Sequence, residues 1–175
     1  MASLDKRRFL FFVDDLYEDL ELWYPKLRLQ EEGAGVILAG MEAGMNYTGK
    51  HGYPCVSDAA VAEMREPDFH GLIIPGGFAP DKLRRVPAVL ELTRQFQRSG
   101  KMVAHICHGG WIPISAKIVS GYRCTSTPGI KDDLENAGAT WVDQPVVRDR
   151  NQISSRRPDD LPFFCREIIE YMKSR

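Results

Sequence analysis

Short apolar runs alternate with longer amphipathic segments along the chain, and this alternation restricts the possible fold more than any other feature. Four compact apolar runs have the length and composition of buried strands, at residues 8–13, 36–39, 70–74 and 101–106. Segments of helical length follow or separate them, at residues 17–32, 86–98, 111–119, 128–136 and 159–173. Strands that alternate with helices build a parallel sheet with helices on both faces. The sequence therefore predicts an α/β fold.

Prolines and glycines interrupt this pattern at defined positions. Pro25 lies inside the first helical segment, so we expect a kink or a break there. Glycines between residues 44 and 57 predict an irregular hairpin, and residues 140–155 hold two short strand patterns around Asp149. The sequence contains no internal repeat and no linker composition, so we expect residues 1–175 to form a single domain.

The charge balance and the cysteine content exclude several classes of protein. The chain has 23 basic and 24 acidic residues, so it has no cationic excess with which to bind nucleic acid. Its apolar runs are too short to cross a bilayer and its first residues do not resemble a signal peptide, so we expect a cytoplasmic protein without a membrane partner. The four cysteines are far apart in sequence and form no CxxC pair. We therefore expect no metal and no cofactor.

Three predicted strand ends are candidate positions for a site, because ligands of open α/β sheets bind beyond the carboxyl ends of the strands. Residues 14–19 follow the first strand and are strongly acidic, which disfavours phosphate and argues against a flavin mononucleotide or nucleotide carrier. Such a loop could instead supply a carboxyl group to a reactive atom nearby. The other two strand ends are residues 75–77 and 107–110, both rich in glycine.

Cys107 lies where a predicted strand meets a predicted helix. The order strand, cysteine, small residues, helix is the cysteine version of the sharp turn that presents a nucleophile above a sheet. A helix N-terminus favours the thiolate, and the backbone N–H after Cys107 would face an oxyanion. The glycine pair Gly76 and Gly77 could supply a second N–H donor. The alternative is a buried structural thiol, which is how we interpret Cys55, Cys124 and Cys165.

Other ionisable residues have both functional and structural interpretations. Glu18 and Glu21 share one face of a helix on which Leu20, Trp23 and Leu27 recur at helical spacing, so we expect at least one of these glutamates to be partly buried. Burial would raise the pKa of that carboxyl and keep it protonated, so that it could donate a hydrogen bond to the cysteine sulfur.

The histidines beside Cys107 are open to more than one interpretation as well. His108 could be a general base or a solvent-facing residue at a helix start. His105 is expected to pack under the sheet. A zinc site built from His105, Cys107 and His108 is disfavoured because it needs a further ligand and a different local geometry.

Six motifs in order along the chain resemble the PfpI-type intracellular proteases of the ThiJ/PfpI superfamily, which are related to class I glutamine amidotransferases. They occupy residues 17–22, 49–53, 75–77, 104–109, 128–133 and 154–156. The resemblance implies a flavodoxin-like three-layer sandwich with a mostly parallel central sheet and a cysteine nucleophile elbow. It also implies that Cys107 is the nucleophile and His108 the catalytic histidine. Glu21 matches a buried acid that hydrogen-bonds the sulfur, and Glu18 matches a second pocket acid.

The resemblance further implies an oxyanion hole and an assembly. Gly77 and His108 match the backbone donors of the oxyanion hole. In protease-like members the third catalytic acid comes from a neighbouring subunit, which implies a homodimer or a higher homo-oligomer with the site near the interface. Asp81 occupies that position here, where the family carries a glutamate, so its reach is shorter. Thr127 replaces a common aromatic residue and should widen the pocket, and Gly110 replaces a proline or alanine and should loosen the turn.

Three functional hypotheses use the same thiol, so the motifs do not separate them. The first is a stress-related cysteine hydrolase in which Cys107 attacks an amide and Asp81 of a partner orients His108. The second is a glyoxalase or deglycase that acts on methylglyoxal or its adducts. The third is an oxidative-stress sensor in which Cys107 is oxidised to a sulfinate that Glu21 hydrogen-bonds. A narrow site at an interface favours a small peptide or a reactive aldehyde as substrate.

Overall fold

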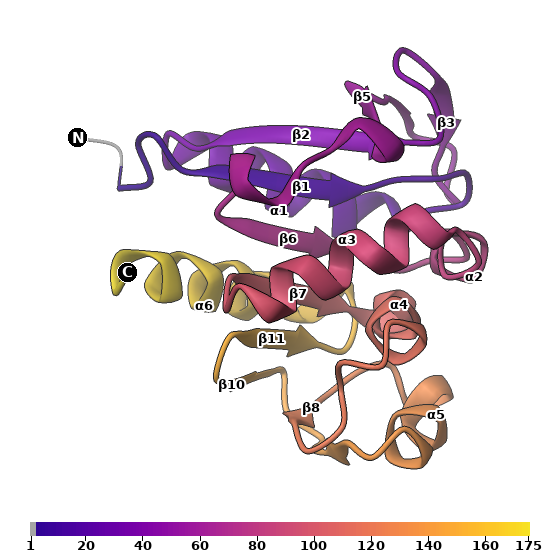
Figure 1. Ribbon diagram of the computed structural model, residues 1–175, viewed down its shortest axis with the longest axis vertical. Coiled ribbons are helices and arrows are strands. Elements are labelled where there is room, and N and C mark those ends of the chain that lie inside the picture. The colour runs from indigo at the N-terminus through magenta and orange to yellow at the C-terminus, as the bar shows by residue number, and fades with distance from the viewer. Residues whose placement is uncertain (1–2) are drawn as a thin grey trace.

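The computed structural model describes residues 3–175 and places a seven-stranded sheet between two layers of helices (Figure 1). The strand order is β10-β11-β7-β6-β1-β2-β5, and every neighbouring pair is parallel except β10 and β11. The strands are β1 (Arg8–Phe12), β2 (Gly35–Gly40), β5 (Ala59–Ala60), β6 (Gly71–Ile74), β7 (Met102–Ile106), β10 (Val146–Asp149) and β11 (Gln152–Ser155). The mostly parallel three-layer sandwich expected from the sequence is confirmed.

The helices cover the two faces of this sheet in separate groups. They are α1 (Asp19–Glu31), α2 (Ala79–Leu83), α3 (Pro87–Arg98), α4 (Trp111–Ser115), α5 (Lys131–Asn136) and α6 (Leu161–Lys173). Helix α1 packs beside α6 on one face, whereas α3 packs beside α4 on the other (Figure 1). Short 3-10 turns join several elements: η1 (Val61–Glu63), η2 (Glu66–Asp68), η3 (Cys107–Gly110), η4 (Pro128–Ile130) and η5 (Pro158–Asp160).

Two small accessory sheets lie outside the central one. Strands β3 (Asn46–Thr48) and β4 (Pro54–Val56) form an antiparallel hairpin, and β8 (Arg123–Cys124) pairs with β9 (Thr140–Trp141) in parallel. The hairpin corresponds to the irregular hairpin predicted between residues 44 and 57. Among residues 3–175, no helix combines the length and the apolar character needed to cross a membrane.

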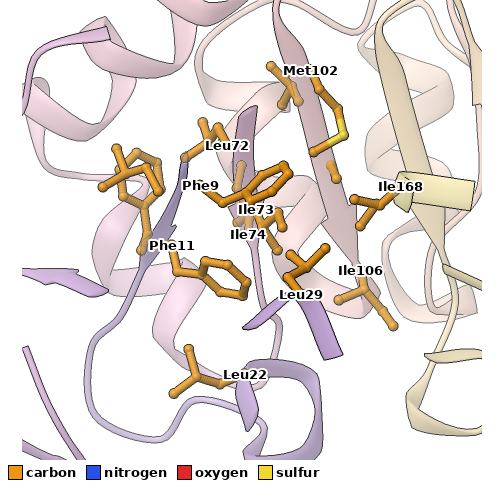
Figure 2. Packing of buried hydrophobic residues seen from close by; sticks show 14 of the residues in the cluster. Phe9, Phe11, Leu22, Leu29, Leu72, Ile73, Ile74, Met102, Ile106 and Ile168 are labelled. Carbon is orange, nitrogen blue, oxygen red and sulfur yellow. The ribbon is translucent and has the colours of Figure 1, made fainter. Parts of the chain in front are cut away.

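The central strands are buried on both faces, which explains their nearly continuous apolar sequences. Every residue of β6 and β7 is buried. Leu22 and Leu29 of α1 and Ile168 of α6 belong to one cluster with the strand residues Phe9 and Ile106 (Figure 2). This packing fixes the carboxyl ends of β1, β6 and β7, where the candidate site lies.

Three details of the predicted elements differ from the structure. Helix α1 continues through Pro25, which lies in the middle of the helix and is buried against the interior. Helix α4 ends at Ser115 rather than at residue 119, because Lys117 adopts a positive φ of 60°. The apolar stripe of α1 faces outward, since Leu20 and Leu27 are each 56% exposed, whereas Leu22 and Leu29 face the core.

Candidate functional site

Cys107 follows β7 directly and occupies the sharp turn that the sequence predicts. Its φ is 59°, in the left-handed region that a residue with a side chain rarely adopts, so the turn holds about 1–3 kcal/mol of backbone strain. Gly109 permits this turn, because a Cβ atom there would collide with the carbonyl oxygen of Ile74. The thiol is partly exposed, whereas Cys55, Cys124 and Cys165 are buried. Of the four thiols, Cys107 is therefore the one that a substrate can reach.

Gly76 brings the thiol and a buried acid together. Its N–H donates to Oε2 of Glu21 at 2.8 Å. A Cβ atom at Gly76 would lie 2.5 Å from that oxygen and 2.8 Å from Cβ of Cys107. Only a residue without a side chain can occupy this position, so the glycine allows Glu21 and Cys107 to be neighbours.

Glu21 is fully buried, and burial raises the pKa of its carboxyl to about 8, with a further contribution from the charge of Glu18. At neutral pH the carboxyl is therefore protonated and can donate a proton. Its second oxygen, Oε1, is buried and has no hydrogen-bond partner among residues 3–175. Glu21 is thus a buried glutamate, as the sequence predicts for at least one of the two, and its hydrogen bond to the sulfur of Cys107 stays a prediction.

The charge state of Cys107 differs from the one expected from sequence. Burial, followed by the neighbouring Glu21 carboxyl, raises the pKa of the thiol to about 12, although the backbone N–H of His108 and the charge of Lys50 lower it. Desolvation outweighs the dipole because the turn η3 and helix α4 are short. The resting group is therefore a thiol, and the thiolate must form by proton transfer during the reaction.

His108 is placed to accept that proton. Its Nδ1 lies 3.3 Å from Sγ of Cys107. Burial, together with the positive charge of Lys50, lowers the pKa of His108. The imidazole is therefore neutral at pH 7 and can act as a base. The sequence-based assignment of a thiol and histidine pair is geometrically possible in a single chain.

Glu18 is also buried, at 3% exposure, and it has a clear structural role. It is the N-cap of α1, where its Oε2 accepts the N–H of Glu21 at 2.9 Å. Its Oε1 lies 3.6 Å from Nε2 of His51. Both predicted pocket acids are thus buried, but Glu18 shapes the start of the helix as well as the pocket.

Asp19 belongs to the group that comes nearest to a metal-ligand set. Ligand atoms of Glu18, Asp19 and His51 all lie within 4.8 Å of one another. The two oxygens of Asp19 accept backbone N–H groups from His51 at 2.9 Å and Tyr53 at 2.8 Å. Since backbone donors already compensate Asp19, we interpret this group as the anchor of the hairpin loop.

The backbone N–H of Gly77, one of the two predicted oxyanion donors, is unpaired in the described part of the chain. Gly77 has a φ of 81°. The adjoining backbone is held in place, because Glu18 N–H donates to Gly76 C=O at 3.1 Å and Phe78 N–H donates to Leu16 C=O at 2.8 Å. The assignment of the Gly77 and His108 N–H groups to an oxyanion hole stays a prediction.

Asp81 is not part of this group within one chain. Its side chain is 56% exposed on α2, where it pairs with Arg85 at 2.9 Å. No contact joins it to His108 in the described part of the chain. The role of Asp81 toward a neighbouring subunit therefore stays a prediction.

His105 and Gly110 lie next to each other near the turn at Cys107. His105 is fully buried, as expected, and neither ring nitrogen has a partner within residues 3–175. Burial lowers its pKa to about 4. A Cβ atom at Gly110 would lie 3.4 Å from Nδ1 of His105 and 3.0 Å from Cδ1 of Ile130. The imidazole takes the space that a larger residue would need, which gives a physical reason for glycine at position 110.

Lys50 is a site residue to which sequence reasoning gave no role. It lies in the loop between β3 and β4, and its N–H donates to Tyr17 C=O at 2.9 Å. Its charge lowers the pKa of Glu21, Cys107 and His108. The available signal was its place in one of the six motifs, at residues 49–53.

An open groove of about 700 Å³ adjoins the acids at the start of α1. Its lining residues are Glu18, Asp19, Leu20, Trp23, Leu27, His51, Gly52 and Tyr53. Trp23 and Tyr53 meet edge to face, with ring centroids 5.2 Å apart. The groove is mostly apolar, and Glu18 and Asp19 are the carboxylates in its lining.

Comparison with known protein families and sequences gives a consistent picture. A sequence model of the DJ-1/PfpI family matches residues 7–171. A Pyrococcus abyssi protein named as a deglycase is 46% identical over 166 residues, which cover 95% of this chain and 99% of the relative. The Bacillus subtilis protein YraA, provisionally named as a cysteine protease, is 38% identical over 167 residues, which cover 95% of this chain and 99% of YraA.

Solved structures share the same fold. A two-domain protein of Anabaena variabilis, described as containing DJ-1/ThiJ/PfpI-like and ferritin-like domains, superposes with a TM-score of 0.93 and 32% identity. The match covers 95% of this chain and 48% of that protein, so the chain spans about half of its length. DJ-1beta of Drosophila melanogaster gives a TM-score of 0.90 at 25% identity, over 97% of this chain and 91% of that protein.

Proposed function

Because this chain belongs to the DJ-1/PfpI family, we propose that it is a cysteine-dependent enzyme that acts on reactive 2-oxoaldehydes or their adducts, with methylglyoxal as the simplest substrate. One observation carries the proposal. A thiol, a neutral base and a protonated acid meet within a single chain at Cys107, His108 and Glu21.

These three groups suffice for addition to an aldehyde. Sγ of Cys107 adds to the carbonyl carbon, its proton passes to His108, and Glu21 protonates the new oxygen to give a hemithioacetal. Transfer of the carbon-bound proton to the neighbouring ketone carbon, together with transfer of the hydroxyl proton to the ketone oxygen, converts the hemithioacetal into a thioester of lactate. Water then releases lactate and restores the thiol, so that methylglyoxal and water give lactate without an oxidant or a reductant.

Amide hydrolysis is the second candidate, and it requires more than one chain supplies. The leaving amine must be protonated, and the base is normally oriented by a further polar group. Asp81 is the residue assigned to that task, and it pairs with Arg85 on the surface of α2. Its exposed position and the name of YraA favour keeping hydrolysis of small peptides as the alternative.

A second copy of this chain is the partner we propose for the exposed apolar side chains near the site. Leu20 and Leu27 line the groove beside Glu18, and Phe78 is 63% exposed at the start of α2, the helix that carries Asp81. Large exposed apolar side chains beside a site are expected at an interface between subunits. We expect the combined substitutions Leu20→Glu and Leu27→Glu to shift the protein toward a monomer in light scattering. A wild-type protein that is already monomeric would contradict the proposed assembly.

A parallel assay tests the activity. Purified protein is incubated with methylglyoxal, with lactate as the readout, and with a panel of small fluorogenic peptides. Cys107→Ser should abolish turnover, whereas Cys124→Ser, which removes a buried thiol in β8, should retain it. Asp81→Ala should spare methylglyoxal turnover. Peptide cleavage that needs Asp81, without any lactate formation, would favour the alternative instead.

A further inference from the structure

His108 must be held in one orientation if it is to serve Cys107, but no carboxylate in the described part of the chain contacts its ring. The aromatic side chain beside it is Trp111, the first residue of α4. The two ring centroids are 5.0 Å apart, and their planes meet at 55°. We propose that Trp111 is a positioning residue for His108, and that Asp133 on α5 holds Trp111 in place. The proposal rests on the proton-accepting role given to His108 above.

The indole of Trp111 is fixed from two directions. Its Nε1–H donates to Oδ2 of Asp133 at 2.8 Å. The guanidinium of Arg84 lies over the indole ring at 5.4 Å, and Nε of Arg84 donates to Oγ of Ser115 at 2.8 Å. Side chains from the end of α2 and from α5 therefore converge on one ring. This arrangement limits the rotamers of Trp111, and through it those of His108.

The turn η4 lies near the other nitrogen of the His108 ring, since a Cβ atom at Gly129 would be 3.7 Å from Nε2. Nδ1 of the same ring lies 3.3 Å from the sulfur of Cys107. When the thiol proton moves to His108, the ring becomes a cation, and a neighbouring aromatic ring stabilises a cation.

Asp133 has a neighbour that provides a matched control. Asp132 and Asp133 both lie in the first turn of α5, where an acid interacts favourably with the helix dipole. Both are exposed, but only Asp133 has a side-chain partner among the described residues. Replacing either removes one helix-start charge, so a difference between the two substitutions reports the bond to Trp111.

The test measures the rate at which iodoacetamide alkylates Cys107, read by mass spectrometry of the peptide that contains it, from pH 6 to pH 10.5. Trp111→Leu and Asp133→Ala should slow alkylation about tenfold at pH 7, whereas Asp132→Ala should not. Asp133→Asn should restore the rate, because its amide oxygen still accepts the indole N–H. The deficit should shrink toward pH 10.5, where hydroxide replaces His108 as the base.

Two outcomes would overturn the proposal. One is equal slowing by Asp132→Ala and Asp133→Ala, and the other is a deficit that stays constant over the whole pH range, as a merely structural role would give. Thermal unfolding of each variant shows whether it is folded. If Trp111→Leu does not fold, the comparison of Asp133→Ala with Asp133→Asn decides the test. Alkylation needs no turnover, so a lack of activity toward aldehydes and peptides would refute the proposed function without deciding this test.

Discussion

Replacing Glu21 with glutamine should change how the stability of the protein depends on pH. The ordinary pKa of a glutamate is 4.5, and burial raises that of Glu21 to about 8 in the folded protein. Between these values the unfolded chain loses a proton that the folded protein keeps, so the free energy of unfolding falls as pH rises. Below pH 4.5 both states hold the proton, and this penalty is absent.

The size of the effect follows from the width of this window. One pKa unit corresponds to about 1.4 kcal/mol, and Glu21 is half ionised in the folded protein at pH 8, so it should remove about 3.5 kcal/mol of stability between pH 5 and pH 8. Glutamine does not titrate and avoids this loss. Any cost of fitting the glutamine amide beside Gly76 is independent of pH. The quantity to compare is therefore how the gap in the free energy of unfolding between wild type and Glu21→Gln changes with pH.

Urea unfolding at pH 5, 6, 7 and 8, followed by tryptophan fluorescence, measures this gap. Glu170→Gln is the control, because it replaces an exposed carboxyl on α6. The gap should move in favour of Glu21→Gln as pH rises and stay constant for Glu170→Gln. A constant gap for Glu21→Gln would mean that Glu21 is ionised at neutral pH, and Glu21 could then not serve as the proton donor.

Three further changes test the surroundings of the site. Burial lowers the pKa of His105 from 6.5 to about 4, so the unfolded state gains a proton first as pH falls, and the free energy of unfolding decreases. This decrease amounts to about 2 kcal/mol between pH 7 and pH 5, and His105→Leu should abolish it. Urea unfolding curves that keep the pH dependence of the wild type would contradict this prediction. Gly76→Ala should lower the free energy of unfolding by about 1–3 kcal/mol in urea, because the new methyl group would collide with the Glu21 carboxyl and with Cβ of Cys107; an unchanged stability would refute the close approach. Tyr17→Phe removes a hydrogen bond to the carbonyl of Tyr53 at 2.5 Å and should cost about 1 kcal/mol, with faster amide exchange in residues 49–53; unaltered exchange would show that this bond does not hold the loop.

The sheet and the nucleophile were predictable because each leaves a local mark in the sequence. Strands buried on both faces must be apolar at nearly every position, as β6 and β7 are, so they appear as continuous runs. The strained turn at Cys107 requires glycine at position 109, since the backbone there approaches that of Ile74 closely. Contacts between neighbours in sequence and backbone requirements are what a sequence shows directly.

The orientation of α1 could not be predicted from periodicity. Its apolar residues at helical spacing include Leu20 and Leu27, which are exposed, whereas the acidic Glu18 and Glu21 are buried. An ordinary surface helix would have the opposite arrangement. The helix departs from the usual pattern because its inner face serves the site and its outer face lines an apolar groove.

Contacts between distant segments are the second limit of sequence reasoning. The bond from Trp111 to Asp133 joins residues 22 positions apart, and an acid near a helix start is already explained by the dipole. Lys50 lies in the loop between β3 and β4, far from Cys107 in the sequence, and its charge lowers the pKa of the Cys107 thiol. Nothing in the sequence around Lys50 predicts this effect. Such residues become candidates only when the fold places them together.

The destabilising features of this protein are concentrated at the carboxyl ends of two strands. A left-handed cysteine, a buried glutamate and a histidine with no hydrogen-bond partner among residues 3–175 all lie within the turn after β7 or against it. Each is unfavourable by itself, and together they can persist only where the surrounding backbone cannot relax. Buried strands on both sides provide that rigidity, and glycines at 76, 109 and 110 remove the side chains that would force the groups apart. Substitutions that relieve the strain should therefore stabilise the fold while they separate the thiol from its acid and its base.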